Sequence, residues 1–221
     1  MKLFVWDFHG VLEKGNDRAV LEITNRALTF HGHFRQMTES EGIALAGLRW
    51  HEYFAFLLPE HSADEWLKIQ STCFEIGHSQ PEIITKHIQL NDHADLVLSS
   101  IEATDHQQIL ISNTVPKSLD MFIEIVGIEK YFPISHRFAA DTHHQKAVTK
   151  KNCLGEFLKR YDCFESIISI GDSPSDMSLI EQDGVPCGVG YLYSHPGRAH
   201  RLAKADYKIN DLRHVLQEIR F

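Results

Sequence analysis

The stretch VWDFHGVL, residues 5–12, decides the fold of this chain. Its apolar start predicts a buried strand, which reaches the carboxylate of Asp7 and then turns at Gly10. In this way a buried strand brings an acidic group to the edge of a sheet. His9 is the unusual residue, because it places an imidazole two positions after the aspartate.

The segment that follows this strand predicts helices. Apolar side chains recur at helical spacing over residues 19–28 and again over residues 50–57. Pro59 and Pro81 lie at plausible helix boundaries within the same segment. We therefore expect residues 14–92 to form an all-helical insertion, and residues 1–13 and 93–221 to form the core of the protein.

Strand and helix patterns alternate after the insertion. A helix is expected over 93–103, and the later helices are expected over 116–127, 153–161, 175–182 and 211–219, the last capped by Asn210. The expected strands are 109–112, 133–135, 166–172, 185–191 and 207–209. This alternation predicts an α/β fold, a Rossmann-like parallel sheet covered by helices on both faces.

The composition limits the function. The chain has 221 residues, is 43% hydrophobic and carries a formal net charge of −8, which disfavours a nucleic-acid partner. No apolar run approaches the roughly 20 residues that cross a bilayer, and Asp7 comes too early for a signal peptide. We expect a cytoplasmic protein without a membrane partner. Its four cysteines are widely spaced and predict neither a disulfide framework nor a zinc site.

Three predicted strands end in polar residues. These are WDFHG (6–10), ISNT (111–114) and IGDSPSD (170–176). Ligands of open parallel sheets bind beyond the carboxyl ends of the strands, so Asp7, Ser112 and Asp172 should meet at one edge. Together with a lysine before the helical run CLGEFL, these motifs resemble those of the haloacid dehalogenase (HAD) superfamily. The resemblance covers roughly residues 1–13 and 93–221, and the helical insertion resembles the cap domain of that superfamily.

The resemblance implies a phosphohydrolase that works through an aspartyl-phosphate. Asp7 is then the nucleophile, since a carboxylate is anionic at neutral pH without an activating base. Asp172 is expected to bind Mg²⁺ together with Asp7 and the backbone carbonyl of His9, because magnesium prefers oxygen ligands. Asp176, one helical turn later, is expected to support the metal's waters or the lysine.

Other residues would hold the substrate. Ser112 and Asn113 match the motif that binds phosphoryl oxygens. Lys150 has the best spacing for the phosphate-binding lysine, with Lys146 and Lys151 as alternatives. In the insertion, Arg49 is a candidate for binding a carboxylate or a second phosphate of the substrate, although a solvated arginine at a helix start is the simpler explanation. The implied partner is a small phosphorylated metabolite, and the protein would be a monomer or a homodimer.

His9 departs from the resemblance, because phosphatases of the superfamily normally have a second aspartate there. An imidazole can also act as a general acid and base. A nearby magnesium ion and lysine should favour its neutral form, which is a competent base but a scarcer acid. We therefore expect a preference for acyl and aryl phosphates, whose leaving groups need little protonation.

Two other functions fit the same residues. His9 can mark a lost activity, which would leave a phosphometabolite-binding or regulatory protein. Dehalogenase or phosphonatase chemistry on the same scaffold also departs from aspartate at this position. The phosphohydrolase and the binding protein imply the same fold and the same metal site.

Overall fold

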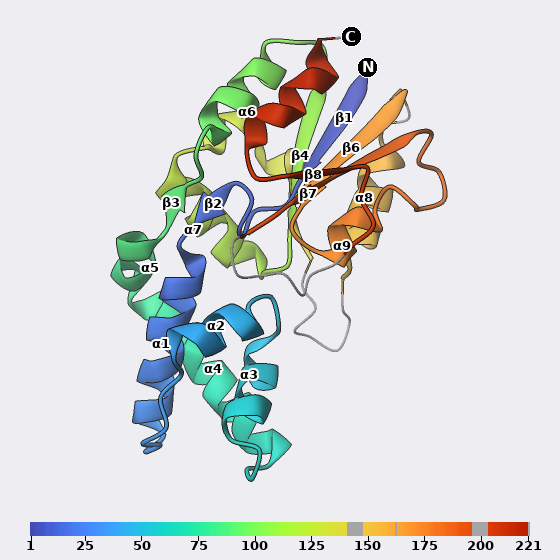
Figure 1. Cartoon of the computed structure of the whole chain (residues 1–221). Coiled ribbons are helices and arrows are strands. Elements are labelled where there is room, and N and C mark those ends of the chain that lie inside the picture. Colours follow the sequence, from blue (N-terminus) through green and yellow to red (C-terminus); the bar gives the residue numbers. More distant parts are fainter. Residues whose placement is uncertain (141–147, 162, 196–202, 221) are drawn as a thin grey trace. The chain divides into compact units, whose positions relative to one another are not determined.

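A six-stranded parallel sheet forms the centre of the larger unit of the chain, in the order β5-β4-β1-β6-β7-β8 (Figure 1). The strands are β1 (Lys2–Trp6), β4 (Gln107–Ser112), β5 (Arg137–Ala139), β6 (Ser166–Gly171), β7 (Gly188–Tyr193) and β8 (Tyr207–Ile209). The structure is a computed structural model that describes residues 1–140, 148–161, 163–195 and 203–220. The predicted α/β fold is confirmed.

Strand β1 lies in the middle of the sheet, between β4 and β6. Leu3 to Trp6 are buried, as expected for a parallel strand that is covered on both faces. Trp6 lies opposite Leu110 of β4 and Ile170 of β6, so the three strands end close together. This register brings the residues after each strand to one edge of the sheet.

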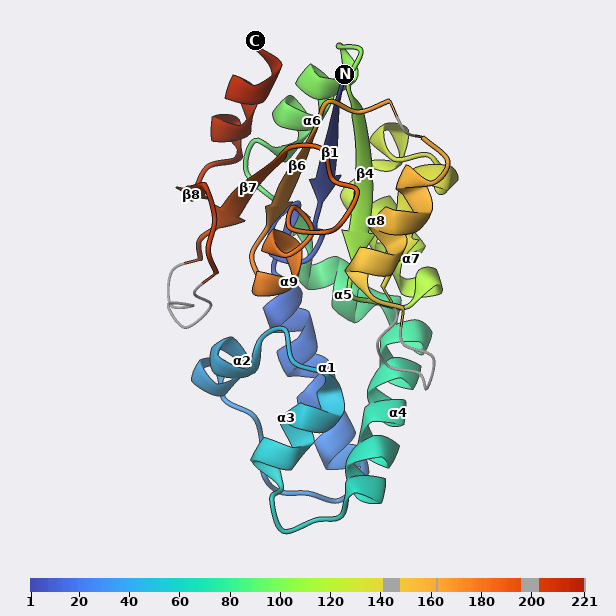
Figure 2. The ribbon, with the colours of Figure 1, turned by 90° about the vertical axis from the view of Figure 1, so that its right-hand side faces the viewer.

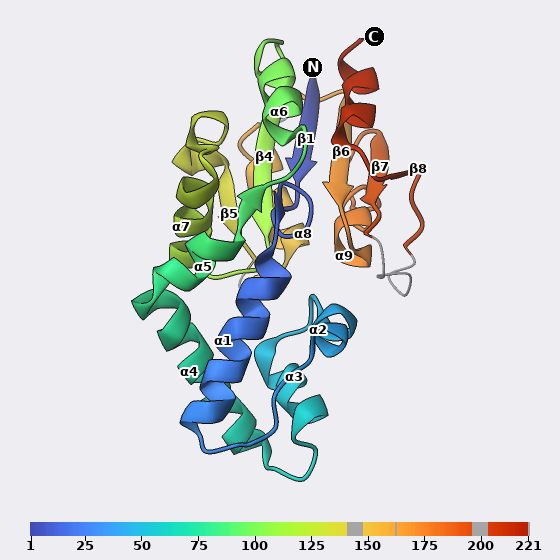
Figure 3. The same cartoon turned by 60° about the vertical axis from the view of Figure 1, so that its left-hand side comes forward.

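Helices cover both faces of this sheet (Figures 2 and 3). They are α6 (Ala94–Glu102), α7 (Pro116–Val126), α8 (Lys150–Leu158), α9 (Pro174–Met177) and the short 3-10 segments Glu129–Tyr131, Ile134–His136 and Leu212–Ile219. One buried cluster joins Leu3 and Val5 of β1 to Ile109 of β4 and to Leu154 and Phe157 of α8. Alternate residues of β1 therefore face α8, and the others face the opposite layer.

Four predicted elements differ from the structure. The strand expected at 133–135 is wrong: Ile134–His136 is a 3-10 turn and the strand starts at Arg137, where Phe138 pairs opposite Ile111. Pro133 has no N–H to donate to a ladder. The helix expected over 153–161 lies at Lys150–Leu158, one turn earlier.

The other two differences concern short helical segments. The helix expected over 175–182 ends at Met177 and gives way to turns. The last segment, Leu212–Ile219, is a 3-10 helix, and its cap is Asp211, not Asn210. The Asp211 side chain accepts a hydrogen bond from the backbone N–H of Arg213.

The second unit, Gly15–Gln89, is helical. It contains α1 (Asn16–Phe30), α2 (Glu39–Leu45), α3 (Trp50–Leu57), α4 (Ala63–Ser79) and α5 (Pro81–His87). Thr38 and Ser62 start α2 and α4 with capping boxes, in which a glutamate three residues later completes the pair of hydrogen bonds. The larger unit comprises Met1–Lys14 and Leu90–Phe221.

Two short strands mark the places where the chain passes from one unit to the other. Strand β2 (Glu13–Lys14) pairs with β3 (Gln89–Leu90) in a separate two-stranded sheet. In the part of the chain that the structure describes, no helix has the length and apolarity that crossing a bilayer requires.

Candidate active site

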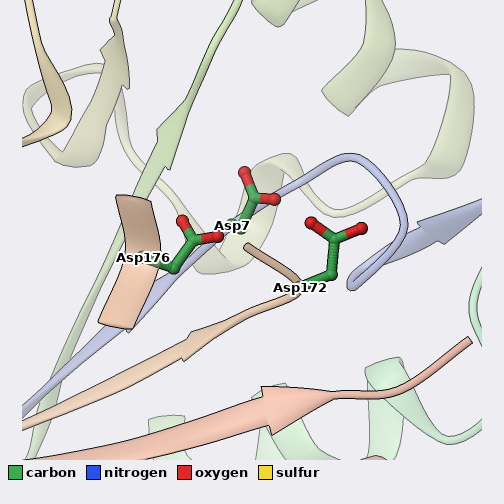
Figure 4. A group of neighbouring side chains, drawn as sticks. All are labelled: Asp7, Asp172 and Asp176. Carbon is green, nitrogen blue, oxygen red and sulfur yellow. The ribbon is translucent and has the colours of Figure 1, made fainter. Parts of the chain in front are cut away.

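Three buried carboxylates gather where β1 and β6 end (Figure 4). The backbone N–H of Asp7 donates to the carbonyl of Ile170 at 2.8 Å, which ties the residue after β1 to β6. Carboxylate oxygens of Asp7, Asp172 and Asp176 lie within 4.8 Å of one another. All three residues are less than 10% exposed. The structure thus brings the predicted nucleophile and both predicted metal-site aspartates together.

Lys150 reaches this cluster from the start of α8. Its Nζ donates to Asp7 Oδ1 and to Asp176 Oδ1, each at 2.6 Å. Only 4% of Lys150 is exposed, whereas its neighbour Lys151 is exposed. Of the three lysines considered from the sequence, Lys150 is therefore the one that the structure places at the carboxylates. Lys146 lies outside the described residues.

A glycine makes room for Asp176. A Cβ atom on Gly171, the last residue of β6, would lie 2.1 Å from Cβ and Cγ of Asp176. Asp176 also closes the capping box of α9, because its Oδ2 accepts the backbone N–H of Ser173 at 3.1 Å. The carboxylate is thus held by its own helix cap on one oxygen and by Lys150 on the other.

Burial and neighbouring charges shift the pKa values of Asp7 and Lys150. Burial raises the pKa of Asp7 to about 7; the Lys150 ammonium opposes the shift, and the carboxylates of Asp176 and Asp172 add to it. Burial lowers the pKa of Lys150, but the carboxylates of Asp176 and Asp7 outweigh it and raise that pKa above its ordinary value. The lysine is therefore a fixed positive charge, and Asp7 holds its negative charge weakly in a site without a further cation.

The cluster is suited to a divalent cation. It places three carboxylates beside one ammonium, so another positive charge would relieve the repulsion that adds to the effect of burial on the pKa of Asp7. Carboxylate oxygens are the ligands that hard cations prefer. The residues present therefore fit a metal such as Mg²⁺.

Strand β4 contributes Ser112, which is fully buried. Its Oγ has no hydrogen-bond partner among the described residues, although a buried hydroxyl normally has one. Asn113 follows it and is exposed. The hydroxyl at the end of β4 is therefore a buried polar group whose hydrogen bond the described residues do not supply.

Arg49 belongs to the helical unit and precedes α3. Its backbone N–H donates to Glu52 Oε2 at 2.7 Å, and its Nε donates to the same oxygen at 3.2 Å. The guanidinium of Arg49 is thus engaged at the start of its own helix, and its predicted role at the substrate stays a prediction.

His9 lies in the tight turn after β1. The backbone N–H groups of Val11, Leu12 and Glu13 all point at the carbonyl of Phe8, and Gly10 has a positive φ of 80°. The turn folds residue 13 back onto residue 9, and Nδ1 of His9 lies 3.0 Å from Glu13 Oε1. The imidazole therefore has a carboxylate neighbour.

Two residues near the site were missed from the sequence. Glu13 is 0% exposed, and the signal for it was a charged residue directly after the apolar pair Val11 and Leu12. His195 follows β7, and its Nε2 lies 3.6 Å from Asp172 Oδ2. No local pattern indicates His195, because only the pairing of β7 with β6 brings it there.

Several solved structures share this fold. A putative phosphatase from Clostridium difficile aligns with a TM-score of 0.79 at 12% identity, covering 99% of this chain and 98% of that chain. A predicted phosphoglycolate phosphatase from Haemophilus somnus gives 0.77 at 15% identity, with coverage of 99% and 98%. A putative beta-phosphoglucomutase from Thermotoga maritima gives 0.70 at 17% identity, with coverage of 99% and 100%. At these identities the likeness concerns the fold alone.

The sequence itself matches a family model. No curated protein matches the chain. The model of the haloacid dehalogenase-like hydrolases matches residues 4–189, a span that begins in β1 and includes the three aspartates and Lys150. The chain belongs to the haloacid dehalogenase-like hydrolase family.

Proposed function

We propose that the protein is a Mg²⁺-dependent phosphohydrolase that acts on a small phosphorylated metabolite through an aspartyl-phosphate on Asp7. One observation carries the proposal. Lys150 is buried between Asp7 and Asp176 while the carboxylate of Asp172 lies beside them, at the end of the central strand. Burying these charges together is costly, which favours a functional reason for their presence.

Asp7, Asp172 and the backbone carbonyl of His9 would hold the metal, with Asp176 supporting it. When bound, Mg²⁺ supplies the positive charge that keeps Asp7 ionised and offsets the charge of the phosphoryl oxygens. Lys150 adds a second fixed positive charge at the same place.

In the proposed reaction, Asp7 is the nucleophile and His9 transfers the protons. An Oδ atom of Asp7 attacks phosphorus, the ester P–O bond breaks, and His9 gives a proton to the leaving oxygen. Water then attacks the phosphorus of the aspartyl-phosphate, and His9 takes a proton from it. The products are the free alcohol or acid, inorganic phosphate and the original carboxylate of Asp7.

Ser112, Asn113 and Lys150 would bind the phosphoryl oxygens during both steps. The buried Ser112 hydroxyl lacks a partner in the described residues, so a phosphoryl oxygen would satisfy it. Arg49 would bind a second anionic group of the substrate. If so, Arg49→Ala raises KM about tenfold or more with little change in kcat, because a guanidinium–anion pair is lost in the ground state and the transition state alike.

The test measures phosphate release from alkyl, aryl and acyl phosphates with Mg²⁺, for the wild type, Asp7→Asn and Asp105→Asn. Asp105 is an exposed aspartate of the same unit and serves as the matched control. We expect Asp7→Asn to lose at least about 1,000-fold in kcat, as nucleophile removal does elsewhere, with Asp105→Asn unchanged. Chelation should abolish release, and added Mg²⁺ should restore it.

The same panel can overturn the proposal. Release that is equal in the wild type and Asp7→Asn would exclude Asp7 as the nucleophile. No release on any substrate would favour the binding or regulatory alternative. Halide release from a haloacid or C–P cleavage of a phosphonate, both added to the panel, would favour the dehalogenase or phosphonatase alternative.

A further inference from the structure

The ring of His9 is held from three sides. Phe8 lies edge-on to it at 5.1 Å between ring centroids, and Phe122 of α7 does so at 4.8 Å. Glu13 Oε1 lies 3.0 Å from Nδ1. The side chain of His9 is still 22% exposed, so these contacts hold the ring in place while part of it remains accessible to solvent.

Glu13 occupies a position that otherwise suits an apolar residue. Phe8, Val11 and Leu12, the apolar side chains of the turn, are all 0% exposed, and so is Glu13. A carboxylate in such surroundings is costly unless it is hydrogen-bonded. Its partners therefore explain its presence, and His9 is one of them.

The contacts of Glu13 indicate which atom is the donor in its hydrogen bond with His9. Oε1 accepts the backbone N–H of Gly10 at 3.0 Å and faces Nδ1 of His9 at the same distance. An ionised carboxylate can only accept, so beside an ionised Glu13 the hydrogen lies on Nδ1. A neutral imidazole then has its lone pair on Nε2.

We propose that Glu13 is the positioning residue for His9: it holds the ring in the Nδ1–H form, so that Nε2 is the nitrogen that exchanges protons. The proton exchange at Nε2 rests on the proposed function. The orientation and tautomer of the ring do not depend on it.

The first test is spectroscopic and needs no substrate. Long-range ¹H–¹⁵N NMR of the neutral ring, assigned by loss of the signals in His9→Gln, should show Nδ1–H in the wild type. Glu13→Met removes the acceptor and should shift the ring towards Nε2–H, whereas Glu13→Gln keeps an acceptor oxygen and should retain Nδ1–H. Glu22→Gln, which alters the His87–Glu22 pair of the helical unit, is the matched control. An unchanged ring in Glu13→Met overturns the proposal.

The second test is a double-mutant cycle on phosphate release. Glu13→Met should lower kcat for alkyl phosphates about 10- to 100-fold, as loss of an orienting partner does at other histidines, and Glu13→Gln should lower it less. In the His9→Asp background, Glu13→Met should cause no loss, because two adjacent carboxylates repel each other. Equal losses in both backgrounds would mean that Glu13 acts only on the fold, which overturns the proposal.

The two proposals fail in different ways. If no variant releases phosphate while the NMR result is as expected, the phosphohydrolase proposal fails and Glu13 still orients His9. If Asp7→Asn abolishes release but the ring of Glu13→Met is unchanged, the phosphohydrolase proposal stands and the role of Glu13 fails.

Discussion

The α/β unit and the helical unit hold their main charge clusters in opposite ways. In the core, the side chains of Asp7, Asp176 and Lys150 are 8%, 2% and 3% exposed. In the helical unit, Glu22 meets His87, Lys86 and Arg26 at the surface, where Lys86 and Arg26 are 64% and 48% exposed.

The pKa values of the two central carboxylates move apart. Burial raises the pKa of Asp7 to about 7, whereas the hydrogen bond from His87, followed by that from Lys86, lowers the pKa of Glu22 to about 2. A carboxylate with a raised pKa is destabilised by its site, and one with a lowered pKa is stabilised. Burial in the core cluster therefore disfavours the charged form of Asp7, whereas the surface cluster favours the charged form of Glu22 and contributes to stability.

The largest effect is expected where the core cluster is broken. Lys150→Met should lower the free energy of unfolding by about 3–5 kcal/mol, because it leaves two buried carboxylates without their cation. Lys151→Met, on the exposed neighbour, should change it by less than about 0.5 kcal/mol. Urea unfolding with a chelator present measures both. Similar losses in the two variants would show that the buried cluster contributes no more than a surface charge.

A smaller effect is expected in the helical unit, from its backbone. Gly15 precedes α1 with φ at 100°, and a Cβ atom there would lie 2.1 Å from the carbonyl oxygen of His87. Gly15→Ala should therefore cost about 2 kcal/mol or more. Gly32→Ala is the matched control. Its φ is 79°, but beyond its chain neighbours no described residue has an atom within 4 Å of the added Cβ, so only the backbone strain of about 1 kcal/mol remains. Equal costs in urea unfolding would contradict the role of the His87 contact.

The smallest effect is expected at the surface cluster. The folded pKa of Glu22 is below its usual value, so its stabilisation is present above about pH 4.5 and is lost as the pH falls towards about 2. Glu22→Gln should cost roughly 0.5–1 kcal/mol at pH 7, discounted for exposure, and the difference should narrow in acid. Glu75→Gln, on an exposed residue of α4, should show no such trend. Urea unfolding at several pH values measures the stability difference between each variant and the wild type. A difference for Glu22→Gln that does not change with pH would contradict the stabilising role of Glu22.

Much of the core could be predicted because its signals are local. Short apolar strands that end in polar residues predicted β1, β4 and β6. The polar residues at their ends, Asp7, Ser112 and Asp172, needed only the parallel arrangement to be placed at one edge. The short 3-10 segments were harder, because Ile134–His136 and Leu212–Ile219 carry patterns that also fit strands or α-helices.

In the candidate site, too, the sequence predicted some residues, and only the tertiary structure identified the others. Three lysines fitted the spacing of the phosphate-binding position, and the structure brings Lys150 to the carboxylates because α8 begins one turn earlier than its apolar pattern indicated. Glu13 had only a weak signal, a charged residue after an apolar pair, and His195 had none. They reach His9 and Asp172 through the turn after β1 and through the pairing of β7 with β6.

The sequence by itself determined the α/β architecture, the helical insertion and the aspartates at the strand ends, since these depend on periodicity and on the rule that parallel strands end together. Tertiary structure decided which side chains meet: Lys150 between two carboxylates, and Glu13 against His9. Periodicity indicates which face of an element is buried, but a contact between two charged side chains depends on atomic positions that only the packed chain defines.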